Sequence, residues 1–303
     1  MMGAGKSRGR ADSGFVLVAV LWILGALATL ASIYSVYAVN TVAASHVADD
    51  RVQAEASIRA GIEMAVLGQL AVPARVRPSH GAFDLRVGRT KVAVRFQSEA
   101  ARIDLNAAPA DLVAGLFAAV GVDSVHAKSY ADRVIGWRTK ADVNAASREA
   151  KLYADEGIRY PPRQAQFDDP LELALLPGLP EPIVERILPF VTVFSGRPGI
   201  DVASADPAVL SALPGMTPQI LSSVLKAQAN DRGDREALLA LLGPARAYAA
   251  TDESKTVRAA VAVEFDNGGR VHAEVVFRLK DRGDEPYDVL YWRDDFDGPM
   301  QSA

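Results

Sequence analysis

The longest apolar stretch of the chain lies near its N-terminus. No residue from Phe15 to Ser45 carries a formal charge, and the apolar residues are densest over Phe15–Val39. A helix needs about 20 apolar residues to cross the hydrocarbon layer of a membrane. The pattern therefore predicts a transmembrane helix over residues 15–39.

The charges before this stretch predict its orientation. Lys6, Arg8 and Arg10 precede it, against one acid, Asp12. Because positive residues tend to stay in the cytoplasm, we expect the C-terminal part outside the cytoplasm, held by a single span. A cleaved secretory signal is the alternative, but its apolar region runs about 7–15 residues before a small-residue cleavage site. The stretch in this chain is longer.

Farther along, the apolar residues take up a helical spacing. Ile58, Ile62, Val66 and Leu70 recur every four residues, which places them on one helix face. A ladder of alternating charges at the same interval supports the helix: Arg51, Glu55, Arg59 and Glu63. Pro73 ends the segment, since proline cannot continue a helix interior. We predict one helix of about 55 residues, longer than an ordinary globular helix, whose second half packs on a soluble domain.

Alternation of polar and apolar residues predicts strands in two regions far apart in the sequence. The predicted strands are Phe83–Val87, Lys91–Phe96, Thr256–Phe265, Arg270–Lys280 and Tyr287–Trp292. Gly88–Arg89 lies between the first two and Asp266–Gly269 between the next two, so each pair is expected to form a hairpin.

Between the two strand regions, the pattern is helical and punctuated by proline. The predicted helices are Pro109–Val120, Ser124–Arg138, Asp169–Leu175, Glu181–Val191, Pro207–Leu213, Pro218–Asn230 and Asp234–Leu242. Ile103–Leu112 and Ile200–Leu210 share one pattern, an extended lead-in, a polar N-cap and a proline in the first helical turn. Paired short helices of this kind are typical of SAM-like or helix-hairpin-helix modules. The sequence thus predicts an α+β fold with an all-α domain inserted between strands.

The amino-acid composition argues against several classes of function. The 303 residues carry a formal net charge of −4, whereas nucleic-acid-binding proteins usually have a basic excess. The absence of cysteine excludes disulfides, thiol catalysis and thiolate-bound zinc. The four histidines, at positions 46, 80, 126 and 272, lack metal-ligand spacing, and no nucleophile motif is present. We do not expect an enzyme.

Taken together, the chain resembles the type II secretion system protein K family, the largest of the minor pseudopilins. Its N-terminus is similar to a type IV prepilin signal, a basic leader that ends at Gly14 before the apolar run from Phe15. Further similar segments are Ile103–Ala108, Ile135–Arg138 and Val191–Gly199. The resemblance implies that prepilin peptidase cleaves between Gly14 and Phe15 and methylates the new Phe15 amine.

One position separates this family from other pilin-like proteins. Most of those subunits carry a glutamate at the fifth position after the cleavage site, and this chain has Ala19 there. Proteins of the K family characteristically lack this glutamate, as expected of a subunit that caps the tip. Ala19 therefore favours the K family over a major pilin.

The resemblance also implies the domain organisation. A pilin-like N-terminal helix would pack on a small antiparallel sheet, with a large SAM-like or helix-hairpin-helix-like domain inserted between strands. The expected parts are a leader peptide at residues 1–14, a transmembrane helix at 15–39, the stalk helix and first strands at 40–105, the inserted helical domain at 106–250, and the C-terminal strands at 251–303.

Some members of the family bind calcium in the helical domain. The candidate ligands in this chain are Asp142, Glu149, Asp155 and Glu156. Calcium takes six to eight oxygen ligands, and Arg138 and Lys140 lie close to Asp142 in the sequence. We therefore expect a solvated loop rather than a calcium site, and no other cofactor.

The function that the resemblance implies is that of a minor pseudopilin at the tip of the type II secretion pseudopilus. It would help to initiate assembly and to export folded proteins across the outer membrane. Expected partners are minor pseudopilins I and J and other pseudopilus subunits, met through the helix face of Ile58, Ile62, Val66 and Leu70, together with prepilin peptidase and membrane lipid. The expected location is the inner membrane, single-pass, with the C-terminal domain in the periplasm.

The alternative is a membrane-tethered DNA-binding protein with helix-hairpin-helix modules. Such modules present backbone amides and nearby cations to phosphates. In the second hairpin Pro218 removes one amide, and no basic residue occurs before Lys226. We therefore expect no nucleic-acid partner.

Overall fold

The computed structural model describes residues 12–140, 150–229, 235–251 and 254–295, apart from the side chains at 12–14, 38–48 and 75. The chain divides into two compact units, Met1–Ala56 and Ser57–Ala303. The long N-terminal helix α1, Asp12–Leu70, contributes residues to both. Its 59 residues confirm the prediction of one helix that ends shortly before Pro73.

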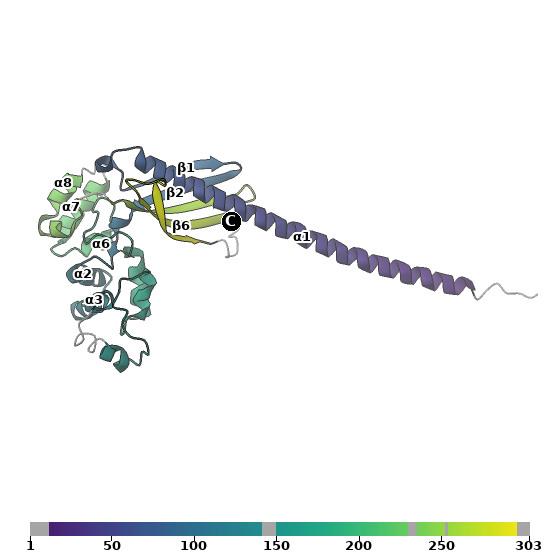
Figure 1. The fold of residues 1–303 in the computed structure, drawn as a ribbon, viewed down its shortest axis with the longest axis horizontal. Coiled ribbons are helices and arrows are strands. Elements are labelled where there is room, and N and C mark those ends of the chain that lie inside the picture. Colours follow the sequence, from purple (N-terminus) through teal and green to yellow (C-terminus); the bar gives the residue numbers. More distant parts are fainter. Residues whose placement is uncertain (1–11, 141–149, 230–234, 252–253, 296–303) are drawn as a thin grey trace, which may run out of the picture. The chain divides into compact units, whose positions relative to one another are not determined.

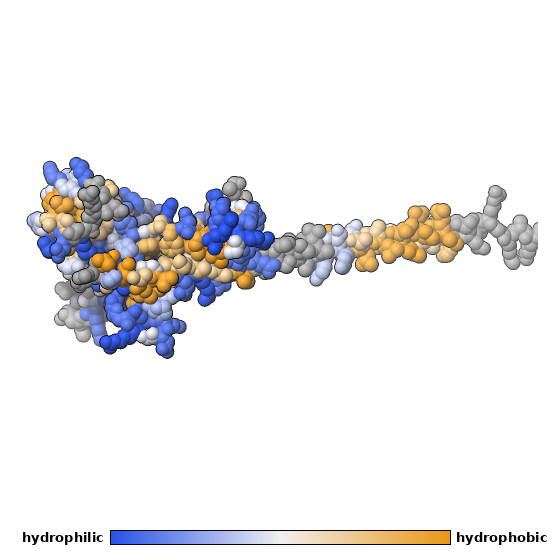
Figure 2. Space-filling model, turned by 90° about the horizontal axis from the view of Figure 1, so that it is seen from above, coloured by the Kyte–Doolittle hydropathy of each residue, from blue (hydrophilic) through white to orange (hydrophobic). Residues whose placement is uncertain are grey.

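The described part of the first unit is helical, and its surface is apolar over Phe15–Tyr37. Residues Phe15–Tyr37 have a mean hydropathy of 2.5, and this helix is the one in the described part of the chain that is long and apolar enough to cross a membrane. Figure 2 shows this stretch in the colour of hydrophobic residues. Its large side chains project outward, as from Phe15 and Trp22, both 77% exposed.

The second unit contains a five-stranded antiparallel sheet with the strand order β1-β2-β5-β6-β7. The strands are β1 (His80–Val87), β2 (Thr90–Ser98), β5 (Thr256–Glu264), β6 (Arg270–Leu279) and β7 (Tyr287–Asp294). The five strands lie where the alternation predicted them. Because β2 pairs with β5, the sheet joins segments separated by about half the chain.

The sheet has one covered face and one open face. Valines alternate along β2 and β5, so Val92, Val94 and Val261 project to the same side and are buried there. The last turns of α1 lie across this side (Figure 1). Ser57 Oγ lies 2.8 Å from Thr90 Oγ1 at one end of this contact.

Gly61 brings α1 close to the sheet. A Cβ atom at this position would lie 2.9 Å from a methyl carbon of Val94, closer than packed atoms approach. The alternating polar residues of the same strands project to the open side. They include Arg95 and Arg258, and Glu274 of the neighbouring β6 projects to the same side.

Between β2 and β5 the chain forms short helices around a second hydrophobic core. The elements are η2 (Glu99–Ala101), β3 (Ile103–Asp104), α2 (Ala110–Ala119), α3 (Ser124–Arg138), η3 (Pro170–Leu175), α5 (Glu181–Ile187), η4 (Leu188–Phe190), β4 (Val191–Thr192), α6 (Pro207–Ser211), α7 (Pro218–Ala229), α8 (Arg235–Leu241) and η5 (Gly243–Tyr248). The short η1 (Ala74–Val76) precedes β1, and residues 150–155 are helical as well.

The helices form two packed groups. Helices α2 and α3 pack together, and α7 packs on α8 (Figure 1). Trp137 is buried in this core, and its indole N–H donates to Glu172 Oε2 at 2.9 Å.

Two of the predicted helices are partly wrong. The segment predicted as Asp169–Leu175 is a 3-10 helix, Pro170–Leu175, in which the Asp169 side chain caps the start. The helix predicted as Glu181–Val191 ends at Ile187, because Pro189 cannot continue it. Val191–Thr192 then forms strand β4, which pairs in parallel with Ile103–Asp104, a pairing that no local pattern indicated.

Only one of the two similar segments starts its helix as predicted. Asp206 caps α6, and its Oδ1 accepts from the Ala208 N–H at 2.8 Å. At α2 the N-cap is Pro109, without a side-chain cap. Asp104, which corresponds to Asp201 of the second segment, accepts from the N–H of Gly196 at 2.7 Å and so holds the loop after β4. The predicted helix ends at Asn230 and Asp234 lie outside the described residues.

A buried ion pair joins the helical region to the sheet. Glu99, fully buried in η2, accepts from Arg258 Nε at 2.9 Å and from the Thr192 hydroxyl at 2.5 Å. Arg258 also donates to Glu274 at 2.7 Å. Burial alone would lower the pKa of Arg258, but its hydrogen bonds and charge interactions with the two glutamates raise that pKa above its ordinary value. The guanidinium therefore stays charged and connects three segments distant in sequence.

Two glycines of α1 test the contact between helix and sheet. We expect Gly61→Ala to lower the free energy of unfolding by about 1–3 kcal/mol, because the new methyl group overpacks the contact with Val94. At Gly68 nothing lies within 4 Å of a Cβ, so Gly68→Ala should stabilise the helix by about 0.5–1 kcal/mol. Chemical denaturation of the full chain in neutral detergent, followed by tryptophan fluorescence, measures both. Equal effects of the two substitutions would contradict the close packing at Gly61.

Removal of Arg258 tests the buried ion pair. We expect Arg258→Met to destabilise the protein by about 3–5 kcal/mol, because the Glu99 carboxylate then stays buried without its cation. The double variant Glu99→Met, Arg258→Met should recover part of this loss, since no unpaired charge remains. Arg270, half exposed and 4.0 Å from Glu264, is the matched control, and Arg270→Met should change stability by less than about 0.5 kcal/mol.

Candidate functional site

The helix face predicted to bind partners is largely inside the protein. Ile58, Ile62 and Val66 are 0%, 1% and 2% exposed and belong to the core. Their spacing of four residues places them on the side of α1 that packs on the valines of the sheet. The prediction that these three side chains meet a partner is therefore wrong, because the chain's own sheet covers them. Leu70, the fourth member, remains 39% exposed.

Other apolar side chains of the same helix segment are accessible. Met64 is 47% exposed and Leu67 is 59% exposed. Together with Leu70 they recur every three residues, so they lie along one side of the helix. We call Met64, Leu67 and Leu70 the exposed stripe. Scattered single apolar residues on a surface are ordinary, whereas three at helical spacing form a surface that a second helix can cover.

A hydrogen bond fixes strand β7 to the helix beside the exposed stripe. The Tyr287 hydroxyl donates to Glu63 Oε1 at 2.7 Å. Burial, together with this hydrogen bond and the negative charge of Glu63, raises the pKa of Tyr287 to about 12. Tyr287 therefore remains a hydrogen-bond donor at neutral pH and holds the Glu63 carboxylate in place.

The predicted processing site lies at the limit of the described residues. Residues 1–11 of the expected leader lie outside them, whereas Gly14 and Phe15 are helical. Phe15 is exposed, and Ala19 is partly exposed. Cleavage and methylation at Phe15 therefore stay predictions.

Two of the four candidate calcium ligands lie among the described residues. Asp142 and Glu149 lie outside the described residues. Asp155 is in the last turn of the helical residues 150–155, and Glu156 follows it. No group of three histidine, aspartate or glutamate side chains within the described part of the chain could hold a metal ion.

A cavity that no sequence pattern indicated lies on the open face of the sheet. It has a volume of about 720 Å³, and Arg95, Arg102 and Arg258 are among the residues that line it. Strand alternation places Arg95 and Arg258 on this face. Nothing local predicts that Arg102 faces them, since Arg102 follows η2 and reaches the cavity only through the tertiary fold.

Comparison with solved structures shows a similar fold. The fold is similar to that of a chain in the crystal structure of the GspK-GspI-GspJ complex from the type 2 secretion system of enterotoxigenic Escherichia coli. The TM-score is 0.57 at 14% sequence identity, and the similarity covers 80% of this chain and 99% of that chain. This likeness shows a shared mixed architecture, with an N-terminal helix and an antiparallel sheet.

Comparison of the sequence with protein families is more specific than the structural similarity. No curated protein sequence matches the chain. Residues 93–196, from β2 through the loop after β4, match the family model for type II secretion system (T2SS), protein K. In this region the chain is similar to the type II secretion system protein K family.

Proposed function

We propose that the protein is a minor pseudopilin at the tip of the type II secretion pseudopilus. It helps to initiate pseudopilus assembly and the export of folded proteins across the outer membrane. The observation that carries this proposal is the match of residues 93–196 to protein K in a chain whose Phe15–Tyr37 helix is long and apolar enough to cross a membrane. The role is structural, with no catalytic step and no required cofactor.

The location follows from the anchor. The protein sits in the inner membrane with one span, and its C-terminal domain lies in the periplasm. Lys6, Arg8 and Arg10 before the apolar helix support this orientation, because positive flanks tend to stay in the cytoplasm.

The N-terminus is processed as in other pseudopilins. Prepilin peptidase removes residues 1–14 and methylates the Phe15 amine, which leaves the apolar helix as the membrane anchor. Ala19 has no carboxylate to pair with the terminal amine of a neighbouring subunit, which suits a subunit at the tip.

The partners are minor pseudopilins I and J. The similar crystal structure contains GspK with GspI and GspJ, and the present chain offers the exposed stripe as a contact surface. Apolar side chains at helical spacing are suited to helix-in-groove or helix–helix packing. The inserted helical region, which we assign to a SAM-like arrangement on its paired short helices, completes the periplasmic domain.

A DNA-binding role gains no support. The formal charge of −4 disfavours phosphate binding. Pro218 starts α7 at the point where a helix-hairpin-helix module would present an amide.

Processing is tested by mass spectrometry of the protein purified from its own membranes. We expect the mature chain to begin at Phe15 with a methylated amine and to require detergent for extraction. In cells that lack prepilin peptidase, the same chain should retain residues 1–14. A mature chain that begins after residue 39 and is freely soluble would overturn the proposal.

The exposed stripe is tested by co-purification with the cognate minor pseudopilins I and J in neutral detergent. We expect Met64→Glu, Leu67→Glu to weaken the complex at least about tenfold, since burial of each side chain contributes roughly 1.5–3 kcal/mol. Both residues are exposed, so the variant should unfold at the same temperature as the wild type.

The matched control places the same two charges elsewhere. Val125→Glu, Leu171→Glu also replaces two exposed apolar residues, in α3 and η3, and should leave the complex unchanged. If both double variants bind the partners as the wild type does, the stripe is not the contact surface.

A further inference from the structure

A cavity lies on the open face of the sheet, above the small side chain of Ala260. The strand register places Arg95 opposite Ala260, and Ala260 opposite Glu274. Arg95 and Glu274 are thus two strands apart, about 10 Å, and the exposed Ala260 between them leaves a hollow. All three line the cavity of about 720 Å³.

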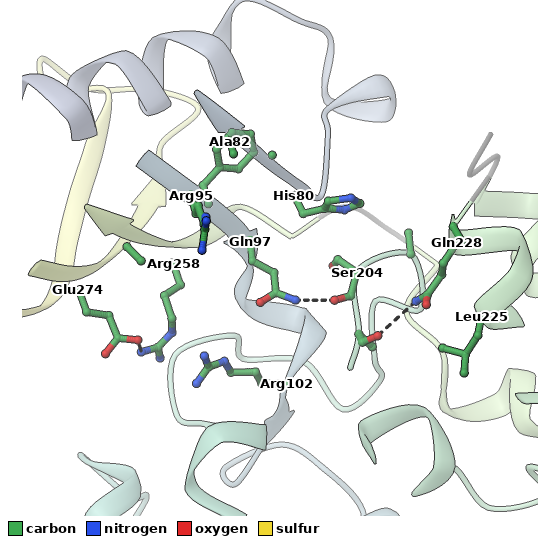
Figure 3. A pocket seen from close by; sticks show the side chains of 16 residues that line it. His80, Ala82, Arg95, Gln97, Arg102, Ser204, Leu225, Gln228, Arg258 and Glu274 are labelled. Carbon is green, nitrogen blue, oxygen red and sulfur yellow. Dashed lines mark hydrogen bonds and ion pairs between the residues drawn. The ribbon is translucent and has the colours of Figure 1, made fainter. Parts of the chain in front are cut away.

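The helical region forms the opposite wall of this cavity (Figure 3). Two glutamines hold that wall in place. The Gln97 side-chain amide donates to the Ser204 carbonyl, and the Gln228 amide donates to the Val202 carbonyl at 2.7 Å. Leu225 of α7 adds an apolar surface. Hydrogen bonds and packing therefore hold the wall of the cavity in position.

Three arginines line the cavity, but only one has its charge neutralised within it. Arg258 is bound to Glu99 and Glu274. The Arg102 side chain is partly buried and forms no hydrogen bond or ion pair with any described residue. Burial, followed by the positive charge of Arg258, lowers the pKa of Arg102, and the negative charges of Glu99 and Glu274 offset only part of this effect. Arg95 is exposed at the rim and likewise has no ionic partner among the described residues.

An unpaired guanidinium at a partly buried position is energetically costly. A carboxylate is the group that relieves this cost best, because it matches the planar fork of arginine with two parallel hydrogen bonds. Figure 3 shows Arg95 extending from β2, and Arg102 from the segment after η2, along the same cavity. Both side chains therefore offer a guanidinium group to a ligand in the cavity.

We propose that this cavity binds an acidic peptide segment of another protein, with a carboxylate on Arg102 and Arg95. The volume favours a chain segment over a single small anion, since binding pockets of several hundred Å³ accommodate larger ligands. A second, separate cavity of about 640 Å³ lies farther along β2 and β5, and Ala93 and Ala262 are among the residues that line it. The site is independent of the exposed stripe, and the inference does not rest on the pseudopilin role.

Fluorescence anisotropy of the full chain in neutral detergent tests the site. The probe is a fluorescein-labelled hexapeptide of alternating alanine and glutamate, and the matched probe carries glutamine in place of glutamate. We expect saturable binding of the acidic peptide that weakens with added salt, and at least about tenfold weaker binding of the glutamine peptide. Non-specific attraction is not expected, because the chain itself carries a formal charge of −4.

Charge-removing variants localise the binding. Arg102→Gln should weaken acidic-peptide binding at least about tenfold, and Arg95→Gln should weaken it by a smaller factor, because its rim position is more hydrated. Arg89→Gln is the control, since Arg89 is exposed in the turn of the same hairpin and does not line the cavity. Because Arg95 is exposed, its variant should fold normally even if Arg102→Gln does not.

Three outcomes would overturn the inference. One is the absence of saturable binding of the acidic peptide. Another is equal binding by the wild type, Arg102→Gln and Arg95→Gln. The third is displacement of the peptide by inorganic phosphate or acetate at the concentration at which the unlabelled peptide competes, which would show a small-anion site instead.

Discussion

The buried contact between Glu99 and Arg258 is the interaction on which the second unit depends. A fully buried carboxylate is tolerated only because a guanidinium and a threonine hydroxyl satisfy it. Its three members come from η2, β5 and β4. The contact thus fixes the point where the chain leaves the sheet, enters the helical region and returns. The parallel pair of β3 and β4, only two residues long on each side, lies directly beside it.

The same ion pair also influences the charges on the open face of the sheet. Because Arg258 is engaged by Glu99 and Glu274, it cannot neutralise another ligand, and its positive charge acts on the neighbouring Arg102. The sheet supplies a small floor at Ala260, and the helical region supplies walls held by two glutamine side chains. The cavity proposed to bind an acidic segment is thus lined by both the sheet and the helical region, and neither part forms it alone.

The C-terminal part of α1 has one buried side and one exposed side. The side with Ile58 and Ile62 packs on the sheet, and Gly61 permits the close approach to Val94. The opposite side leaves Met64 and Leu67 exposed. Since the sheet covers the more regular apolar face, the less regular face is the one left exposed for the proposed partner contacts. Tyr287 links the helix to the edge strand and limits how the two can move apart.

The sequence by itself determined the elements whose cause is local. The apolar run from Phe15, the alternation that gives β5 and β6, and the proline and aspartate that start α6 each follow from side-chain spacing or backbone chemistry, and the structure contains them all. The tertiary structure decided which parts of the chain pack against one another. Spacing showed that Ile58, Ile62 and Val66 share a helix face, but only the folded sheet showed that this face is buried. The pairing of β3 with β4 and the position of Arg102 beside Arg258 likewise join residues far apart in sequence, and no local pattern encodes such contacts, because they depend on how the whole chain packs.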